Sequence, residues 1–249
     1  MVKTVDDTLA AFFLGEGQFS NFGITKMYSE YLWRGLDYRQ TVDEKLKLHG
    51  KWKALDKESR DVRDAGREDL AVIIVKEWGG IGNDSAENIT HFCNAVDIAE
   101  TEIPFSGIAS RSKILPIAYP ERFIIMDARV VIALAAVQLI DRPAEGRLFP
   151  YMESRNKILT RANPFGFLAK PQYRRNALVK KNSIWRKVER KSAYAEYLLL
   201  LRNVSDALLN KGFNHKIWDL EMTLFSQVVG LVKQLENTSV QAAVAASEV

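Results

Sequence analysis

The segment that most constrains the fold is Ala128–Ile140, because its run VVIALAAVQLI places apolar side chains on every face of a helix. Such a helix is stable only when other elements surround it, so we expect it at the centre of a helical core. Asp127 stands directly before it. There its carboxylate would cap the first turn and lie at the positive end of the helix dipole. The sequence therefore predicts a carboxylate held at the edge of the core.

The residues that lead up to Asp127 predict a succession of short elements. Phe105–Ala109 indicates a tight turn around its glycine, and Ser110–Ala118 indicates a short helix. A link bounded by prolines follows, and Phe123–Met126 is an apolar run typical of a strand. We therefore expect a turn, a helix, an extended run and the capped buried helix, in that order.

Asp127 has two possible explanations. The simpler is that it is a helix cap and nothing more, since aspartate is preferred at that position. The second comes from its surroundings: a helix, a glycine turn, a helix with basic residues in its first turns, and an aspartate 20 residues after Gly107. This order of elements resembles the helix-hairpin-helix DNA glycosylases.

Within that superfamily, Phe105–Ala109 resembles the hairpin sequence LPG(V/I)G, and Phe123–Val130 resembles the segment that carries the catalytic aspartate. The strings SKIL, PERF and MDARV are most similar to bacterial proteins with an 8-oxoguanine-DNA-glycosylase-like fold. The resemblance implies a mostly α-helical domain over residues 1–237, with two helical lobes at about 1–80 and 81–237 around a cleft. It also implies double-stranded DNA as the partner and Asp127 as the catalytic residue.

The chain departs from the family pattern at two positions. Ala109 stands where the hairpin normally has a second glycine, and Arg111 stands where the bifunctional members have a lysine. Lys113 lies two residues further along, a rotation of about 200° on a helix, so we expect it to face elsewhere. A guanidinium cannot form a Schiff base. We therefore expect a monofunctional glycosylase that leaves an abasic site, with Lys113 as the only nearby alternative nucleophile.

The expected DNA contacts fall into two groups. The turn would present backbone N–H groups and a helix N-terminus to a phosphate, while basic side chains would hold the strand electrostatically. The residues expected to bind DNA are Ser106, Gly107, Ile108, Ala109, Ser110, Arg111, Arg174, Arg175, Lys180 and Lys181.

The basic charge is concentrated in one segment. Residues 155–191 contain 12 Lys and Arg against one Glu, a local charge of +11, which leaves −7 on the rest of a chain whose net charge is +4. Phe165, Phe167, Tyr173 and Trp185 are interleaved with these charges. A solvated charged surface would account for the lysines but not for the aromatic residues. We expect a long loop that binds the phosphate backbone.

The base pocket is expected on the last long helix. In the resembling branch a Gln contacts the flipped base and a Phe four residues later stacks on it, and Glu221 and Phe225 stand at those positions here. The alternative is that Phe225 is a core residue and Glu221 an exposed charge. A carboxylate in place of the amide accepts hydrogen bonds only, which favours an exocyclic amine. We therefore expect excision of a modified cytosine first, of the bulky kind that marks phage DNA, and of a modified adenine second.

The remaining elements are predicted from periodicity and breakers. A solvated helix or pair of helices is expected in the charge-rich stretch 41–65, residues 141–152 are expected to form a loop, and the tail at 238–249 is expected to be flexible. Further helices are expected at 25–35, 67–78, 84–99, 192–209 and 216–235.

Composition limits the other possibilities. A single cysteine, Cys93, excludes an internal disulfide, and three His with one Cys predict no metal site and no cofactor. The sequence shows no signal peptide and no apolar window long enough to span a membrane, so we expect a cytoplasmic monomer. The alternatives to the glycosylase above are an inactive DNA-binding module of the same fold and a repair glycosylase for oxidised purines. A nuclease is not expected, because the sequence lacks the clustered carboxylates that a pair of catalytic metal ions requires.

Overall fold

The computed structural model describes residues 3–94, 98–154, 156–161 and 184–247. The protein is mostly α-helical, as expected. Its elements are α1 (Val5–Leu14), η1 (Gly17–Phe19), α2 (Ile24–Glu30), α3 (Tyr38–Leu55), α4 (Arg60–Val72), the π-helix η2 (Ile73–Trp78), α5 (Ala86–Asn94), η3 (Glu100–Glu102), α6 (Ile108–Ala118), α7 (Ala128–Asp141), β1 (Glu145–Leu148), α8 (Lys157–Arg161), β2 (Ile184–Lys187), η4 (Arg190–Ser192), α11 (Ala193–Asn210) and α12 (Ile217–Ser247).

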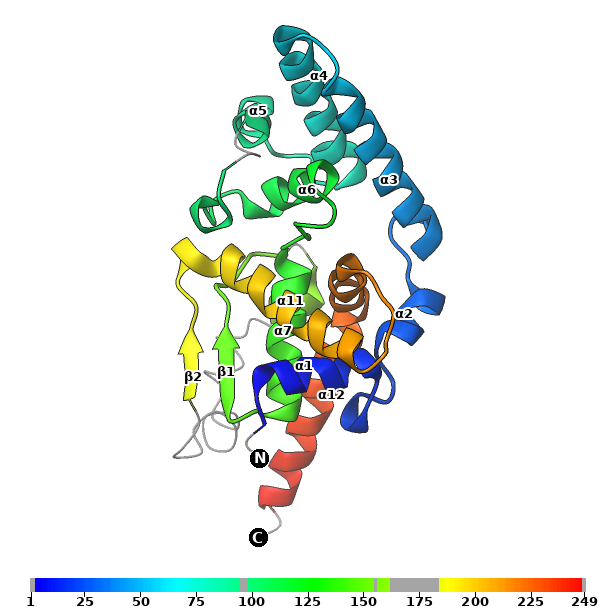
Figure 1. The fold of residues 1–249 in the computed structure, drawn as a ribbon. Helices are drawn as coiled ribbons and strands as arrows, with labels where there is room; N and C mark the ends of the chain where they lie inside the picture. The colour runs from blue at the N-terminus through cyan, green and yellow to red at the C-terminus, as the bar shows by residue number, and fades with distance from the viewer. Residues whose placement is uncertain (1–2, 95–97, 155, 162–183, 248–249) are drawn as a thin grey trace.

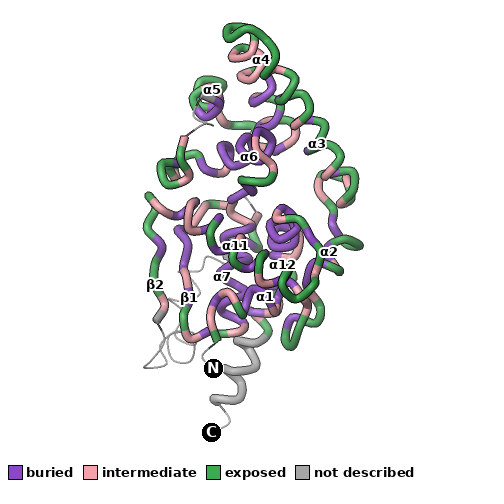
Figure 2. The backbone as a smooth tube through the Cα atoms, viewed as in Figure 1, coloured by how far each residue is buried: buried purple, intermediate pink, exposed green. Residues whose placement is uncertain are grey.

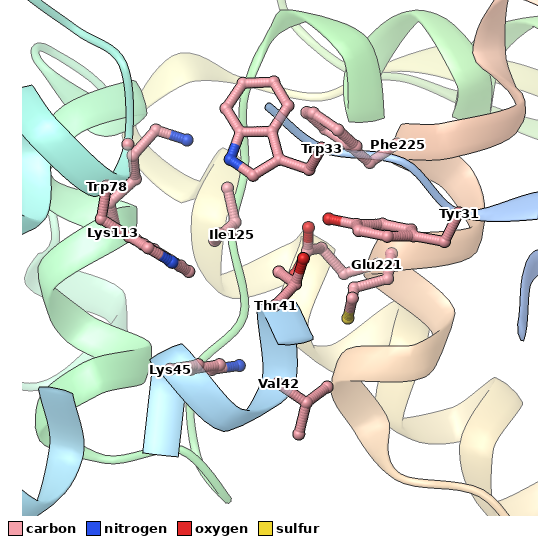
Figure 3. Close-up of a pocket in the computed structure, with 12 residues that line it drawn as sticks. Tyr31, Trp33, Thr41, Val42, Lys45, Trp78, Lys113, Ile125, Glu221 and Phe225 are labelled. Carbon is pink, nitrogen blue, oxygen red and sulfur yellow. The ribbon is translucent and has the colours of Figure 1, made fainter. Parts of the chain in front are cut away.

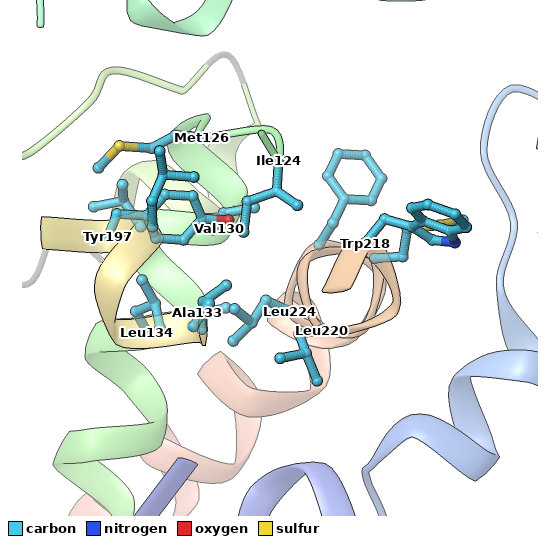
Figure 4. Packing of buried hydrophobic residues seen from close by; sticks show 14 of the residues in the cluster. Ile124, Met126, Val130, Ala133, Leu134, Tyr197, Trp218, Leu220 and Leu224 are labelled. Carbon is cyan, nitrogen blue, oxygen red and sulfur yellow. The ribbon is translucent and has the colours of Figure 1, made fainter. Parts of the chain in front are cut away.

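Helix α7 lies at the centre of the molecule, as its apolar sequence predicts. Every residue from Val130 to Ile140 is buried, and α7 packs against α12, α1, α8 and β1 (Figures 1 and 2). Figure 4 shows Ala133 and Leu134 of α7 close to side chains of α11 and α12. The polar Gln138 is accommodated because its amide donates to the backbone oxygens of Leu134 and Arg147, both at 3.0 Å. The expectation of a buried central helix is confirmed.

The helices form two groups that share one hydrophobic core. Helices α3, α4, α5 and α6 pack together at one end, whereas α1 and α2 pack with α7, α11 and α12 at the other (Figure 1). These groups do not coincide with the expected lobes at 1–80 and 81–237, because α1 and α2 pack with the C-terminal helices while α5 and α6 pack with α3 and α4. The link 119–127 runs from α6 to α7 and so connects the two groups. It ends at Asp127.

The run Phe123–Met126 forms neither a helix nor a strand in the described part of the chain. Side chains satisfy its backbone instead. The hydroxyls of Tyr194 and Tyr197 donate to the backbone oxygens of Ile124 and Ile125 at 2.8 and 2.7 Å. Ser112 Oγ donates to the Met126 oxygen at 3.1 Å and accepts from its N–H at 3.0 Å. The prediction of a strand was wrong because α11 and α6 supply these partners.

Two short strands occur where loops were expected. β1 lies in the expected loop at 141–152, and β2 lies in the basic segment; they pair in parallel with Gly146 opposite Trp185. A Cβ on Gly146 would come within 2.3 Å of the Trp185 ring, so glycine allows this close packing. Strands of four residues give too short a pattern to be recognised in the sequence.

Two helix ends also differ from expectation. α2 stops at Glu30 rather than near residue 35, because Tyr31 is extended and Trp33–Leu36 forms a tight turn with two backbone hydrogen bonds of 2.9 Å. Arg34 and Gly35 have φ of 53° and 85° in that turn. At the other end of the chain, α12 continues past the expected end at 235 as far as Ser247. Over the described ranges, no helix combines the length and apolar character needed to cross a membrane.

Candidate functional site

The predicted turn lies on the surface beside basic residues. Gly107 has a φ of 67° and precedes α6, whose N-terminus has no side-chain cap. A Cβ at Gly107 would lie 2.3 Å from the buried ring of Phe92, so the position requires glycine on both counts. Residues 104–109 line an open groove together with Arg190 and Lys191. Ser106 and Gly107 are exposed in that groove, and Ala109 is partly exposed.

Ser110 and Arg111 do not lie on this surface. Both are buried, with 3% and 2% of their surface exposed. The Ser110 hydroxyl donates to the Asp84 carboxylate. The Arg111 guanidinium carbon lies 4.7 Å from the centroid of Phe92, and burial lowers its pKa. Neither side chain is exposed for DNA binding in this structure, because both positions on α6 face the interior. The contact expected of Ser110 was through its backbone N–H, which donates to the Gly107 oxygen at 3.1 Å. Ile108 is likewise buried and anchors the turn.

The predicted DNA-binding residues Arg174, Arg175, Lys180 and Lys181 lie outside the described residues. The described end of the basic segment includes Arg190, whose guanidinium carbon lies 5.4 Å from the ring of Phe105. This contact connects the basic segment to the turn.

Asp127 caps α7 as predicted. Its Oδ1 accepts hydrogen bonds from the N–H groups of Arg129 at 2.9 Å and Val130 at 3.2 Å. Its Oδ2 lies 3.9 Å from Lys113 Nζ, and the Asp127 side chain is 17% exposed. One oxygen is thus engaged in the cap, while the other faces a cation and remains partly accessible.

Lys113 faces the site, contrary to the expectation from helical rotation. Its side chain is 6% exposed and lines a pocket, whereas Arg111 points toward Phe92. The two side chains do differ by a rotation of about 200° around α6. However, α6 is oriented so that Lys113 points to the pocket and Arg111 points away from it. Gly79 makes room for this lysine, because a Cβ there would come within 2.3 Å of Lys113 Cδ.

The pocket brings together side chains from distant segments (Figure 3). Glu221 and Phe225 both line it, one turn apart on α12, and are buried at 4% and 6% exposed. The suggestion that Glu221 is merely an exposed surface charge is therefore wrong. The residues that line the pocket are Tyr31, Trp33, Thr41, Val42, Lys45, Trp78, Gly79, Lys113, Ile125, Glu221, Met222 and Phe225.

The pocket contains opposed charges in a desolvated setting. Burial, assisted by the nearby carboxylate of Asp127, raises the pKa of Glu221 to about 8 against the opposing effects of Lys45 and Lys113. Burial lowers the pKa of Lys45, against the effect of Glu221. Two carboxyl groups and two amino groups therefore influence one another across the pocket. Shifted ionisation of this kind is common in functional sites.

Aromatic rings line one part of the pocket. The rings of Trp33 and Phe225 meet edge to face with centroids 4.9 Å apart. The guanidinium carbon of Arg129 lies 4.7 Å from the Phe225 centroid and 5.9 Å from that of Trp33. Trp78 Nε1 is buried and has no hydrogen-bond partner in the described part of the chain. The pocket thus has stacking surfaces and an unused donor.

The pocket is narrow in this structure. The centre of a water-sized sphere can occupy about 30 Å³ of it. That is room for one or two water molecules and not for a nucleobase. Entry of a base would therefore require lining side chains to move, and Trp33, which stands on the short turn Trp33–Leu36, is one of them.

Sequence reasoning missed Tyr31, Trp33, Lys45 and Trp78. Lys45 carried a signal that was overlooked: it shares the buried face of α3 with Thr41, Leu48 and Trp52, at the spacing of an amphipathic helix. A lysine among buried positions indicates a special environment. Trp33 gave no comparable signal, since its place depends on the fold.

Comparisons of the chain with protein-family models, curated proteins and solved structures found no match. The described residues also contain no group of three or more His, Cys, Asp or Glu side chains that could hold a metal ion.

Proposed function

We propose that this protein is a DNA glycosylase that flips a modified base out of double-stranded DNA and excises it, with a modified cytosine as its substrate. One observation carries the proposal: Lys113, Glu221 and Phe225 line a single pocket, and Asp127 lies 3.9 Å from Lys113 at its edge. The resemblance assigned Asp127, Glu221 and Phe225 to one site although they come from two separate parts of the chain. Lys113, which the alignment did not place there, lies between Asp127 and the pocket.

The location of the turn supports the same proposal. Gly107 and the uncapped N-terminus of α6 lie in a surface groove with Arg190 and Lys191. Backbone N–H groups and basic side chains together suit a phosphate. Because Lys113 is on the same helix as this N-terminus, a strand held at the groove would lie near the pocket.

In the proposed chemistry, Phe225 binds the base and Asp127 acts on the sugar. A flipped base would stack on Phe225 and place its sugar beside Asp127. As the bond between C1′ and the base nitrogen breaks, its electron pair leaves with the base and positive charge develops on the sugar. Oδ2 of Asp127, which the helix cap leaves unused, would stabilise that charge and accept a proton from the water that attacks C1′.

The test is base release from duplex DNA without added metal. Duplexes that carry single modified cytosines, modified adenines or 8-oxoguanine are incubated with the protein, and released bases are identified by mass spectrometry. Release of a modified cytosine supports the proposal, and preferred release of 8-oxoguanine supports an oxidised-purine glycosylase. DNA binding without release of any base would instead indicate an inactive DNA-binding module.

We expect release to leave an intact abasic site. Lys113 is paired with Asp127, and an ammonium group in an ion pair has no free electron pair with which to attack a sugar carbon. Borohydride should therefore trap no covalent adduct between protein and DNA. Because Lys113 faces the site, the experiment includes Lys113→Arg, which keeps the charge but cannot form a Schiff base. An adduct formed by the wild type and absent in this variant would establish a lyase reaction.

DNA affinity should depend steeply on salt. If the basic segment binds phosphates, the logarithm of affinity falls with the logarithm of salt concentration by about 0.9 per phosphate neutralised. Reversing the charges of Arg174, Arg175, Lys180 and Lys181 to Glu should flatten this slope in fluorescence-anisotropy titrations. The control reverses four exposed basic residues of α3, α4 and the turn between them, namely Lys47, Lys51, Lys57 and Arg60. Equal slopes for both variants would show that residues 155–191 are only a solvated surface.

A further inference from the structure

Lys45 is a buried cation whose position the proposed chemistry leaves unexplained. It lies on α3, only 5% of its surface is exposed, and it lines the same pocket as Glu221 of α12 (Figure 3). Its Nζ lies 5.0 Å from the centroid of the Trp218 ring. Across the described ranges it forms no ion pair within 4.0 Å. The ammonium thus has an aromatic neighbour but no carboxylate in direct contact.

Burying the ammonium of Lys45 in this way is unfavourable unless another interaction compensates for its lost hydration. A buried lysine loses its hydration, and proteins normally offset this loss with a close carboxylate. Here burial lowers the pKa of Lys45, and the carboxylates of Glu221, Asp219 and Glu121 favour the charged form only from a distance. Lys45 lines the pocket, so its ammonium is within reach of a ligand bound there. A ligand with a hydrogen-bond acceptor would supply the missing partner.

We propose that Lys45 reads the excised base by donating a hydrogen bond to the ring nitrogen beside the exocyclic amine that Glu221 accepts. This inference rests on the proposed glycosylase function. Cytosine presents an N4 amine next to the acceptor N3, and adenine presents an N6 amine next to the acceptor N1. Glu221 and Lys45 are an acceptor and a donor on the wall of one pocket, which matches that pair of groups.

The same pair of residues discriminates against other bases. In uracil, thymine, guanine and 8-oxoguanine the corresponding ring nitrogen carries a hydrogen, which would point at the N–H groups of Lys45. Two opposed donors in a buried site leave both unsatisfied, and this penalty is a strong source of selectivity. Lys45 therefore selects the protonation pattern of the ring, whereas Glu221 selects the amine.

The test combines a protein variant with a substrate analogue. The modified cytosine released fastest in the base screen is compared with its 3-deaza analogue, which lacks the N3 acceptor, in wild type and Lys45→Met. Methionine keeps a similar length and tolerates burial. We expect either change alone to lower kcat/KM about 10- to 100-fold, as for the loss of one charged hydrogen bond. The two changes together should cost no more than one, because both remove the same bond.

Comparison of the two substrates within each variant separates this role from a structural one. A loss of folded protein lowers both rates equally and leaves their ratio unchanged. Lys47→Met, an exposed lysine on the same helix, should retain the full wild-type preference for N3. A preference for N3 that persists undiminished in Lys45→Met would overturn the inference.

Failure of the proposed glycosylase function would give a different experimental result. If the wild type releases no base from any duplex, the glycosylase proposal fails. The same pair of duplexes is then compared by equilibrium binding to wild type and Lys45→Met. Weaker binding of the 3-deaza duplex by the wild type only would still support base reading by Lys45, and equal binding of the two duplexes by both proteins would overturn it.

Discussion

Asp127→Asn is expected to reduce base release by at least about two orders of magnitude, which corresponds to roughly 3 kcal/mol of lost transition-state stabilisation. The amide keeps the size of the side chain and can still accept the N–H bonds of Arg129 and Val130, so α7 remains capped. What disappears is the negative charge of the oxygen that faces Lys113. Single-turnover release, circular dichroism and DNA-binding titrations together measure activity, fold and affinity.

A second capped helix provides the control. Asp37 caps α3, and its Oδ1 accepts the Gln40 N–H at 2.9 Å. Asp37→Asn therefore makes the same chemical change at a helix start that the proposed chemistry does not use, and we expect it to retain base release. Near-normal release by Asp127→Asn would show that Asp127 is only a helix cap.

Glu221→Gln is expected to change which base is released. The amide adds a donor where the carboxyl group accepts, so release of a modified cytosine should fall about 10- to 100-fold, while carbonyl-bearing bases are penalised less. Phe225→Ala should lower release of every base by a similar factor, because it removes the stacking surface. Competition between duplexes that carry different bases measures both effects. Full activity of both variants, or 8-oxoguanine as the best wild-type substrate, would show that the pocket is assigned wrongly.

The ionisation of Glu221 adds a pH dependence to this prediction. Burial raises its pKa to about 8, so the neutral acid predominates below that pH and the carboxylate above it. Because the ionised form is the better acceptor for an amine, kcat/KM for a modified cytosine should rise as pH increases through about 8. The charges of Lys45, Lys113 and Asp127 all act on Glu221, so the observed midpoint reflects the whole cluster. The rise should be absent in Glu221→Gln.

Local sequence predicts the positions of some residues of the site but not of others. The cap at Asp127 follows from an aspartate directly before a helix that is apolar all round, and both signals lie within a few turns of chain. Glu221 and Phe225 share a face because they are four residues apart on one helix. The glycine turn before α6 follows from Gly107, whose conformation other residues rarely adopt. Each of these features depends on covalent neighbours and helical geometry.

Tertiary packing decided the rest. Whether Arg111 or Lys113 faces the pocket depends on how α6 is rotated against its neighbours, and α6 is buried on nearly every side, so no polar face indicates its orientation. Tyr31, Trp33 and Lys45 reach Glu221 only because α2 and α3 fold against a helix near the other end of the chain. The sequence by itself determined the central helix, its aspartate cap and the pair on α12, since helical periodicity and capping are local. The tertiary structure alone decided which lysines enter the pocket and which rings close it, since those positions depend on contacts between segments far apart in the chain.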